Sequence, residues 1–282
     1  MKPYIELTKP RITWLILMST AIGYWCGLSS FSWIVLFHLL LGTALIASGT
    51  ATLNQWYERD ADARMNRTRN RPIPAGQVTP TKAFAWGVLL SILGFAELWF
   101  GCNPLTAWSG LFTLATYLFL YTPMKQVHWH ATTIGAVPGA MPPVIGYAAA
   151  RGELNWEAFA LFAILFIWQF PHFYAIAWMY RDDYAKASIR MLPVVEPDGE
   201  STARQIFWFS VALIPISLLP SYLSMTSWLY TIGAFALGLY FFRAALKVVR
   251  ERSLIQARAV LITSVIYLPL LYGLILIDRA IL

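Results

Sequence analysis

Charged side chains are scarce in this sequence. Only 12% of its 282 residues are Asp, Glu, Lys or Arg, whereas soluble domains carry about 25%. Hydrophobic residues make up 58%, and 13 Trp, 14 Tyr and 17 Phe add the aromatic bulk that suits membrane interfaces. No polar stretch is long enough to form a sizeable soluble domain. The composition therefore excludes an ordinary soluble protein and predicts an all-α, polytopic membrane protein.

Cysteine is also rare. The sequence contains only Cys26 and Cys102, so it has neither a metal-ligand spacing nor a disulfide framework. We interpret both as small apolar residues, although the sequence leaves a bridge between them open. The N-terminus has no small-residue cleavage site after a brief apolar core, so a removable signal peptide is not expected.

Apolar runs separated by polar turns predict nine transmembrane helices. The runs cover residues 12–28, 33–57, 82–100, 105–121, 132–150, 156–180, 205–222, 227–246 and 257–277. Of the 21 Lys and Arg residues, all but Arg151 and Arg279 fall on the N-terminal side of this alternation. The positive-inside rule then places the N-terminus in the cytoplasm and the C-terminus outside. The same bias explains the net charge of +7 without nucleic-acid binding.

One of these runs is rich in helix breakers. Between residues 132 and 150 the sequence contains Gly135, Pro138, Gly139, Pro142, Pro143 and Gly146. Such residues are tolerated at membrane depth only where neighbours or a cavity satisfy the freed backbone groups. We therefore expect a kinked or closely packed helix.

The most informative stretch follows the second run, at residues 54–71, and reads N-Q-W-Y-E-R-D-A-D-A-R-M-N-R-T-R-N-R. Asn54, Glu58 and Asp62 recur every four residues, which places them in one stripe on a helix. Three oxygen-bearing side chains so placed can share a hard cation such as Mg²⁺, which also binds phosphate. The arginines that follow, among them Arg67 and Arg71, suit an anionic substrate. A solvated loop with ordinary helix-end charges explains the spacing equally well.

A second acidic cluster ends the run at 156–180. Asp182 and Asp183 form it, and Lys186 follows. The two clusters lie four helices apart, as in a duplicated or pseudo-symmetric core. Facing one another, they could hold two cations around a diphosphate.

The stretch N-Q-W-Y-E-R-D-A-D resembles the first aspartate-rich motif, Asn-x-x-x-Asp-x-x-x-Asp, of the UbiA superfamily of intramembrane prenyltransferases. Further stretches, in order along the chain, resemble the haem-farnesylating branch of that superfamily. They read L-T-K-P-R-I, I-G-A-V-P-G-A-M-P-P-V-I-G-Y, W-Q-F-P-H-F-Y-A-I-A-W and Y-R-D-D-Y-A-K-A-S-I-R-M-L-P-V-V. Two positions depart from the pattern. Glu58 replaces an Asp, and Lys186 stands where an Asp would complete the second motif.

The resemblance implies a single intramembrane prenyltransferase domain over residues 1–282, with its helices around a central cavity that opens near the cytoplasmic side. It implies transfer of a farnesyl group from farnesyl diphosphate to a vinyl group of haem b, with release of diphosphate and Mg²⁺ as cofactor. It also implies a bacterial inner (plasma) membrane protein that contacts lipid. Haem A synthase and terminal-oxidase assembly factors are then candidate partners.

The resemblance also assigns roles to residues. The catalytic and metal-binding set would be Asn54, Glu58, Asp62, Asp182 and Asp183. Diphosphate contacts would come from Arg71, Lys125, Lys186 and, with a weaker case, Arg67. His172 would bind the haem substrate.

Histidines allow alternative interpretations. His172 lies inside an apolar run, where an ionisable residue is a functional candidate by default. A neutral imidazole can bind haem iron, but a hydrogen bond between helices explains His172 equally well. His128 and His130 follow Lys125 in a loop and are expected to be solvated, with haem contact as the alternative. We expect His38 to be a packing or hydrogen-bonded residue, and Glu97 to be half of a structural polar pair.

Other functions remain open at this level. A different member of the same superfamily would prenylate an aromatic acid for quinone synthesis. A secondary transporter would also have breaker-rich helices and intramembrane acids, although the acids here cluster at one membrane edge rather than at the midplane. A non-catalytic haem-handling protein is a third alternative.

Overall fold

The structure, a computed structural model, describes residues 1–281, and this part of the chain is helical with no strand. It divides into two compact units. Unit 1 comprises Met1–Leu154 with Asp183–Ile189, and unit 2 comprises Asn155–Asp182 with Arg190–Leu282. The predicted all-α class is confirmed, and the single domain over 1–282 stays a prediction.

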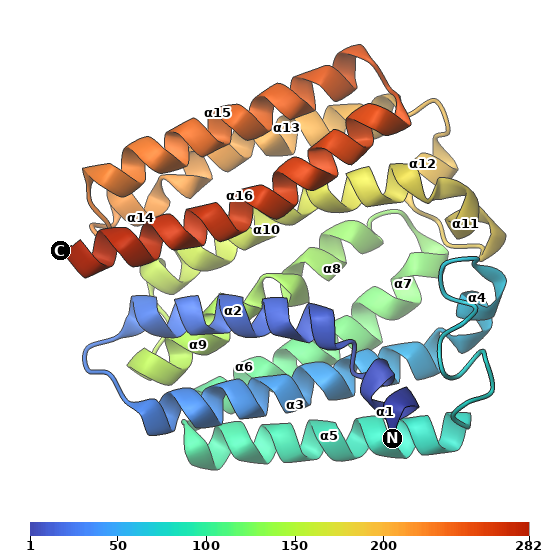
Figure 1. Cartoon of the computed structure of the whole chain (residues 1–282), viewed down its shortest axis with the longest axis horizontal. Coiled ribbons are helices and arrows are strands. Elements are labelled where there is room, and N and C mark those ends of the chain that lie inside the picture. Colours follow the sequence, from blue (N-terminus) through green and yellow to red (C-terminus); the bar gives the residue numbers. More distant parts are fainter. Residues whose placement is uncertain (282) are drawn as a thin grey trace. The chain divides into compact units, whose positions relative to one another are not determined.

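Unit 1 contains the N-terminal helices. Their bounds are α1 Lys2–Leu7, α2 Pro10–Gly27, α3 Trp33–Tyr57, α4 Arg59–Arg64, α5 Pro80–Gly101, α6 Pro104–Ala115, the π-helix η1 Thr116–Tyr121, α7 Thr122–Val127, α8 Ala131–Gly139 and α9 Met141–Arg151; α11, Arg181–Lys186, joins it from residue 183. Helices α3 and α5 run side by side along the unit (Figure 1). They are joined by a 2.7 Å contact between His38 Nδ1 and Glu97 Oε1. The expected partner of Glu97 is therefore His38.

The breaker-rich run is divided into α8 and α9 by Pro142 and Pro143. Proline has no N–H to continue the helical hydrogen bonds, so α8 ends at Gly139 and α9 begins two residues later. Helix α9 packs tightly on α2. A Cβ atom at Gly146 would lie 1.9 Å from the carbonyl oxygen of Thr20, a backbone atom that cannot move aside. The expectation of a kinked, closely packed segment is confirmed.

The N-terminal segment is fastened to the long loop before α5. Leu7 packs with Ile73, Val78 and Ala83 in a buried cluster, and Gln55 Nε2 donates a 2.7 Å hydrogen bond to the carbonyl oxygen of Leu7. Because α1 ends at Leu7, these contacts fix where the chain enters α2.

Unit 2 is a ring of four long helices. The bounds in this unit are α10 Trp156–Met179, α12 Leu192–Val195, α13 Glu200–Ser217, α14 Leu219–Tyr222, α15 Trp228–Arg250 and α16 Leu254–Ile281. Helix α10 packs on α13, α13 on α15, α15 on α16, and α16 on α10 (Figure 1). The N-terminus of α15 is capped from another helix, because buried Asp278 of α16 accepts hydrogen bonds from the backbone of Ser227 and Tyr230.

Six helical segments in residues 1–281 are long and apolar enough to cross a membrane, namely α3, α5, α10, α13 with α14, α15 and α16. This supports the multi-pass membrane protein that the composition predicted. Three more segments, α2, α6–η1 and α8–α9, are shorter or interrupted, so the structure is compatible with nine spans. The count of nine stays a prediction.

Candidate active site

The four-residue spacing of Asn54, Glu58 and Asp62 continues past the end of α3. Glu58 joins α3 to α4, and its N–H donates to the carbonyl oxygen of Asn54 at 2.9 Å. The N–H of Asp62 donates in turn to the carbonyl oxygen of Glu58 at 2.8 Å, which preserves the four-residue spacing. The three residues are 1%, 9% and 1% exposed. A solvated loop is therefore the wrong interpretation of these three positions, although Arg64, Arg67 and Arg69 after them are exposed.

Each oxygen-bearing side chain of the stripe has a basic partner. Lys9 Nζ donates to Asn54 Oδ1 at 3.2 Å. Lys125 Nζ lies 2.8 Å from Glu58 Oε1, and an Arg71 guanidinium nitrogen lies 2.6 Å from Asp62 Oδ2. We call these six residues, Lys9, Asn54, Glu58, Asp62, Arg71 and Lys125, the paired cluster. It alternates anion-binding groups with cation-binding groups in a single buried site.

Lys9 was not expected from the sequence. It is the N-cap of α2 and has the left-handed conformation, with φ 48°, which a residue with a Cβ adopts rarely. That conformation turns the chain between α1 and α2, and the side chain reaches Asn54, 45 residues away in sequence. The only signal was a lysine before Pro10 at the start of an apolar run.

Lys125 reaches the cluster through the π-helix. Directly after η1, the Thr122 hydroxyl donates to the carbonyl oxygen of Tyr117 at 2.8 Å, and the same hydroxyl accepts from Asn54 Nδ2 at 3.2 Å. Lys125 Nζ lies 4.4 Å from the centre of the Tyr121 ring, a cation–π contact. Single π-turns are frequent at functional sites. Here the residues after the π-turn contact the stripe: Thr122 accepts a hydrogen bond from Asn54, and Lys125 contacts Glu58.

Burial and pairing shift the pKa values of this cluster in different directions. Burial, with help from the nearby charge of Arg71, lowers the pKa of Lys9 to about 7. Burial also raises the pKa of Asp62, and the Arg71 contact only partly opposes it. For Glu58, burial would raise the pKa, but the Lys125 ammonium outweighs it and holds that pKa below its usual value. Glu58 conversely raises the pKa of Lys125 well above its usual value against the effect of burial. Glu58 and Lys125 thus form a fully charged pair.

A second group of predicted residues meets the loop after the stripe. Asp183 accepts hydrogen bonds from Asn66 Nδ2 and from the backbone N–H of Arg67, both at 3.3 Å. Lys186 Nζ lies 3.6 Å from the same carboxylate, and the Arg67 guanidinium lies 5.9 Å from the Tyr184 ring centre. Unit 1 therefore contains the first motif together with Asp183, Lys186 and Arg67.

Two predicted residues belong to unit 2. The side chain of Asp182 is 91% exposed and lies 3.8 Å from Arg181. His172 stacks on Trp168 with ring centres 4.8 Å apart, and its Nδ1 is 2.8 Å from Ser264 Oγ. The hydrogen bond between helices that the sequence left open is therefore present, joining α10 to α16. The role of His172 toward haem stays a prediction.

The donor atoms of the paired cluster fit a hard divalent cation. Asp62 Oδ1 is buried and has no hydrogen-bond partner, so one carboxylate oxygen is desolvated and available as a ligand. Asn54 and Glu58 add an amide and a carboxylate oxygen, the ligand types that Mg²⁺ prefers. Among residues 1–281, no three His, Cys, Asp or Glu side chains already converge as a preformed metal site. The arrangement therefore suits a metal that arrives with an anionic substrate.

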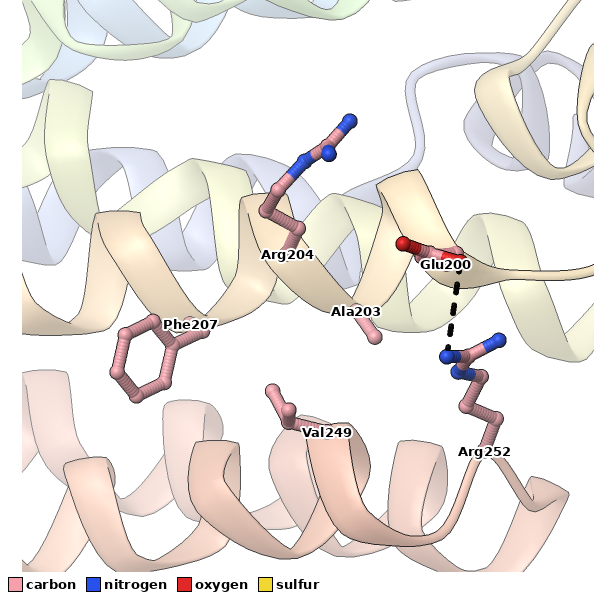
Figure 2. Close-up of a pocket in the computed structure, with 6 residues that line it drawn as sticks. All are labelled: Glu200, Ala203, Arg204, Phe207, Val249 and Arg252. Carbon is pink, nitrogen blue, oxygen red and sulfur yellow. Dashed lines mark ion pairs between the residues drawn. The ribbon is translucent and has the colours of Figure 1, made fainter.

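Unit 2 has a separate surface pocket of about 240 Å³. Figure 2 shows its lining, with Phe207 and Val249 across from one another and Arg252 paired to Glu200. The pocket contains no member of the paired cluster. The central cavity expected from the resemblance stays a prediction.

Comparison with known proteins identifies the family. The UbiA prenyltransferase family matches residues 16–268. The chain is 61% identical to the protoheme IX farnesyltransferase of Solibacter usitatus, over 99% of both chains. It is 47% identical to that of Koribacter versatilis, over 100% of this chain and 94% of the relative.

Solved structures share the fold at low identity. One concerning digeranylgeranylglyceryl phosphate synthase superposes with a TM-score of 0.84 at 16% identity, covering 100% of this chain and 99% of that one. A UbiA homologue from Archaeoglobus fulgidus bound to GPP and Mg²⁺ superposes with a TM-score of 0.72 at 16% identity, covering 97% and 99%. The buried acid–base stripe, the helical fold and the match along most of the sequence agree, and the chain belongs to the UbiA prenyltransferase family.

Proposed function

We propose that this prenyltransferase moves a farnesyl group from farnesyl diphosphate to a vinyl group of haem b, giving haem O and diphosphate. The observation that carries the choice of substrates is the 61% identity, over nearly the whole chain, to a relative named protoheme IX farnesyltransferase. The paired cluster supplies the chemistry that such a reaction needs.

The reaction breaks the bond between the allylic carbon of farnesyl and a diphosphate oxygen, and the electron pair leaves with the diphosphate. The vinyl group of haem supplies the electrons for the new carbon–carbon bond. Water then adds to the neighbouring carbon and loses a proton, which completes the hydroxyethylfarnesyl group. Negative charge grows on the leaving group in the first step, so catalysis depends on cations held in place beforehand.

Lys9, Lys125 and Arg71 are positioned to supply those cations. On arrival of the diphosphate, each can exchange its present oxygen partner for a phosphate oxygen without a long movement. Asn54, Glu58 and Asp62 would hold Mg²⁺, with Asp183 as a further ligand. When bound, the metal neutralises diphosphate charge as a Lewis acid.

The remaining predicted residues have supporting roles in this proposal. Lys186 and Arg67 lie beside Asp183 and would contact the outer phosphate. Asp182 would assist from the start of α11, and His172 would contact haem b. The positive-inside bias supports a bacterial inner membrane protein with its N-terminus in the cytoplasm. Haem A synthase or oxidase assembly factors would receive the product.

The test is haem O formation by the purified protein with haem b, farnesyl diphosphate and Mg²⁺, followed by mass spectrometry. Wild type should form haem O, and Asp62→Ala should form none while still binding haem b. Prenylation of 4-hydroxybenzoate in place of haem b would assign the chain to quinone synthesis instead. Movement of substrate across vesicles without diphosphate release would favour a transporter.

A further inference from the structure

A stack of three rings joins α7 to α8 and has no part in the mechanism above. His128, Trp129 and His130 form this link. The His128 and His130 rings are 4.5 Å apart and 16° from parallel, and the Trp129 and His130 rings are 3.8 Å apart and 24° from parallel. Both histidines are exposed. The stack is thus an accessible aromatic feature in unit 1.

Hydrogen bonds in the stack determine which ring nitrogen carries a proton. His128 Nδ1 and His130 Nδ1 are 2.8 Å apart, a contact in which one nitrogen donates and the other accepts. The backbone N–H of His130 also donates to His128 Nδ1 at 3.1 Å, so His128 Nδ1 is the acceptor. The proton therefore lies on His130 Nδ1. His130 keeps its lone pair on Nε2.

This is the arrangement found in histidines that bind metals. Such a histidine donates its other ring N–H to an acceptor, which fixes the tautomer and the ring orientation. The backbone is also held, since Ala131 N donates to His128 O and Ile134 N to His130 O, both at 3.1 Å. His130 Nε2, the nitrogen that would bind the metal, therefore has no proton, and the backbone on either side of its ring is held by hydrogen bonds.

Helix capping does not explain the choice of His130. It is the N-cap of α8, yet its side chain makes no capping hydrogen bond. Ser, Thr, Asp or Asn at an N-cap typically contributes about 1 kcal/mol. Departures from a local rule of this kind are expected at functional sites.

The site lies close to the paired cluster along the chain. Lys125, which contacts Glu58, is five residues before His130, and five residues span at most about 18 Å. That distance is comparable to the breadth of a porphyrin. A haem held at His130 would therefore have its edge within reach of the prenyl donor.

We propose that His130 is a haem-iron ligand, which receives haem b through Nε2 while His128 holds its tautomer and Trp129 flanks the ring. This inference rests on the proposed function in taking haem b as the acceptor substrate. A bare divalent cation fits less well, because no third His, Cys, Asp or Glu among residues 1–281 joins the pair. A porphyrin already fills four positions of its iron and needs only one histidine.

The test is a ferric haem b titration of the full-length protein in lipid nanodiscs, without farnesyl diphosphate. It is run in a His172→Ala background, because His172 is the other candidate ligand. The His172→Ala protein should show the absorption and electron paramagnetic resonance spectra of histidine-ligated haem. Adding His130→Ala should abolish that signature and raise Kd at least tenfold. Iron-free protoporphyrin IX is the control for folding, and its affinity should be equal in both proteins.

His128 is tested as a positioning residue. His128→Ala should weaken haem binding several-fold, and His128→Asp, a stronger acceptor, should restore it and lower the iron reduction potential. An unchanged spectrum and Kd in the His130→Ala protein would overturn the inference, as would Zn²⁺ binding that depends on His130 while haem binding does not. Wild type that binds haem through His130 but forms no haem O would overturn the proposed function alone. Haem O formation with no loss of ligation in the His130 variant would overturn this inference alone.

Discussion

Replacing Arg71 with Ala tests the central pair of the site. Asp62 is 1% exposed, and its Oδ2 atom has Arg71 as its side-chain partner at 2.6 Å. Its other oxygen already lacks a hydrogen bond. Without Arg71, a buried carboxylate would have no compensating charge on either oxygen. We therefore expect loss of stability as well as loss of activity.

The size of the effect follows from this burial. Breaking a buried ion pair by removing one partner costs about 3–5 kcal/mol. For a unit of the size of unit 1, each kcal/mol lowers Tm by about 2–4 °C, so the expected fall is about 6–20 °C. The measurement is thermal unfolding of the purified protein in one detergent, with Arg69→Ala as the matched control. Arg69 is an exposed arginine two residues away, and its loss should change Tm by less than 2 °C, in keeping with about 0.5 kcal/mol for surface sites.

A second variant separates charge from packing. Adding Asp62→Asn to Arg71→Ala removes the unpaired charge, so most of the lost Tm should return while haem O formation stays absent. If Arg71→Ala unfolds at the wild-type temperature, or if the double variant is less stable than the single one, the pair does not neutralise a buried carboxylate and the reasoning is refuted.

Three further changes have defined outcomes. Lys9→Ala should raise KM for farnesyl diphosphate by about 10- to 100-fold, because a charge-assisted hydrogen bond contributes about 1.5–3 kcal/mol; steady-state kinetics check this, and an unchanged KM contradicts it. Gly146→Ala should lower Tm by about 2–12 °C, because its Cβ would overlap the Thr20 carbonyl oxygen and overpacking costs about 1–3 kcal/mol; a wild-type melting curve would show that α2 and α9 are not in close contact. Asp278→Ala should destabilise unit 2 by about 1–3 kcal/mol through the uncapped start of α15, without changing KM; hydrogen exchange at the Tyr230 amide should increase, and unchanged protection there would rule out the cap.

Local periodicity was enough to predict the stripe. Asn54, Glu58 and Asp62 are linked by consecutive helical hydrogen bonds, so their spacing in sequence sets their spacing in space. The breaker-rich segment was predictable for the same reason, because the effect of proline on a helix is local. The second run, expected at residues 33–57, coincides with α3.

The basic partners of the stripe come from residues far away in the sequence, whose positions depend on local backbone conformation there. Lys9 needs a positive φ at a single residue, and Lys125, 67 residues beyond Glu58, needs the π-turn that precedes it. Neither conformation has a reliable sequence signature. The His38–Glu97 pair was likewise hidden, since two ionisable residues in separate runs meet only when α3 and α5 pack in one register. The tautomer of His130 could be assigned only from the backbone hydrogen bond to His128.

The alternation of acids and bases in the paired cluster couples its two ligands. A diphosphate that arrives alone would draw Lys125 and Arg71 away and leave Glu58 and Asp62 as unpaired carboxylates. A divalent cation that arrives alone would displace the same bases and leave them facing one another. Each ligand therefore relieves the repulsion that the other creates, and linkage requires the coupling to be equal in both directions. We therefore expect phosphate and metal to bind more tightly together than either binds alone.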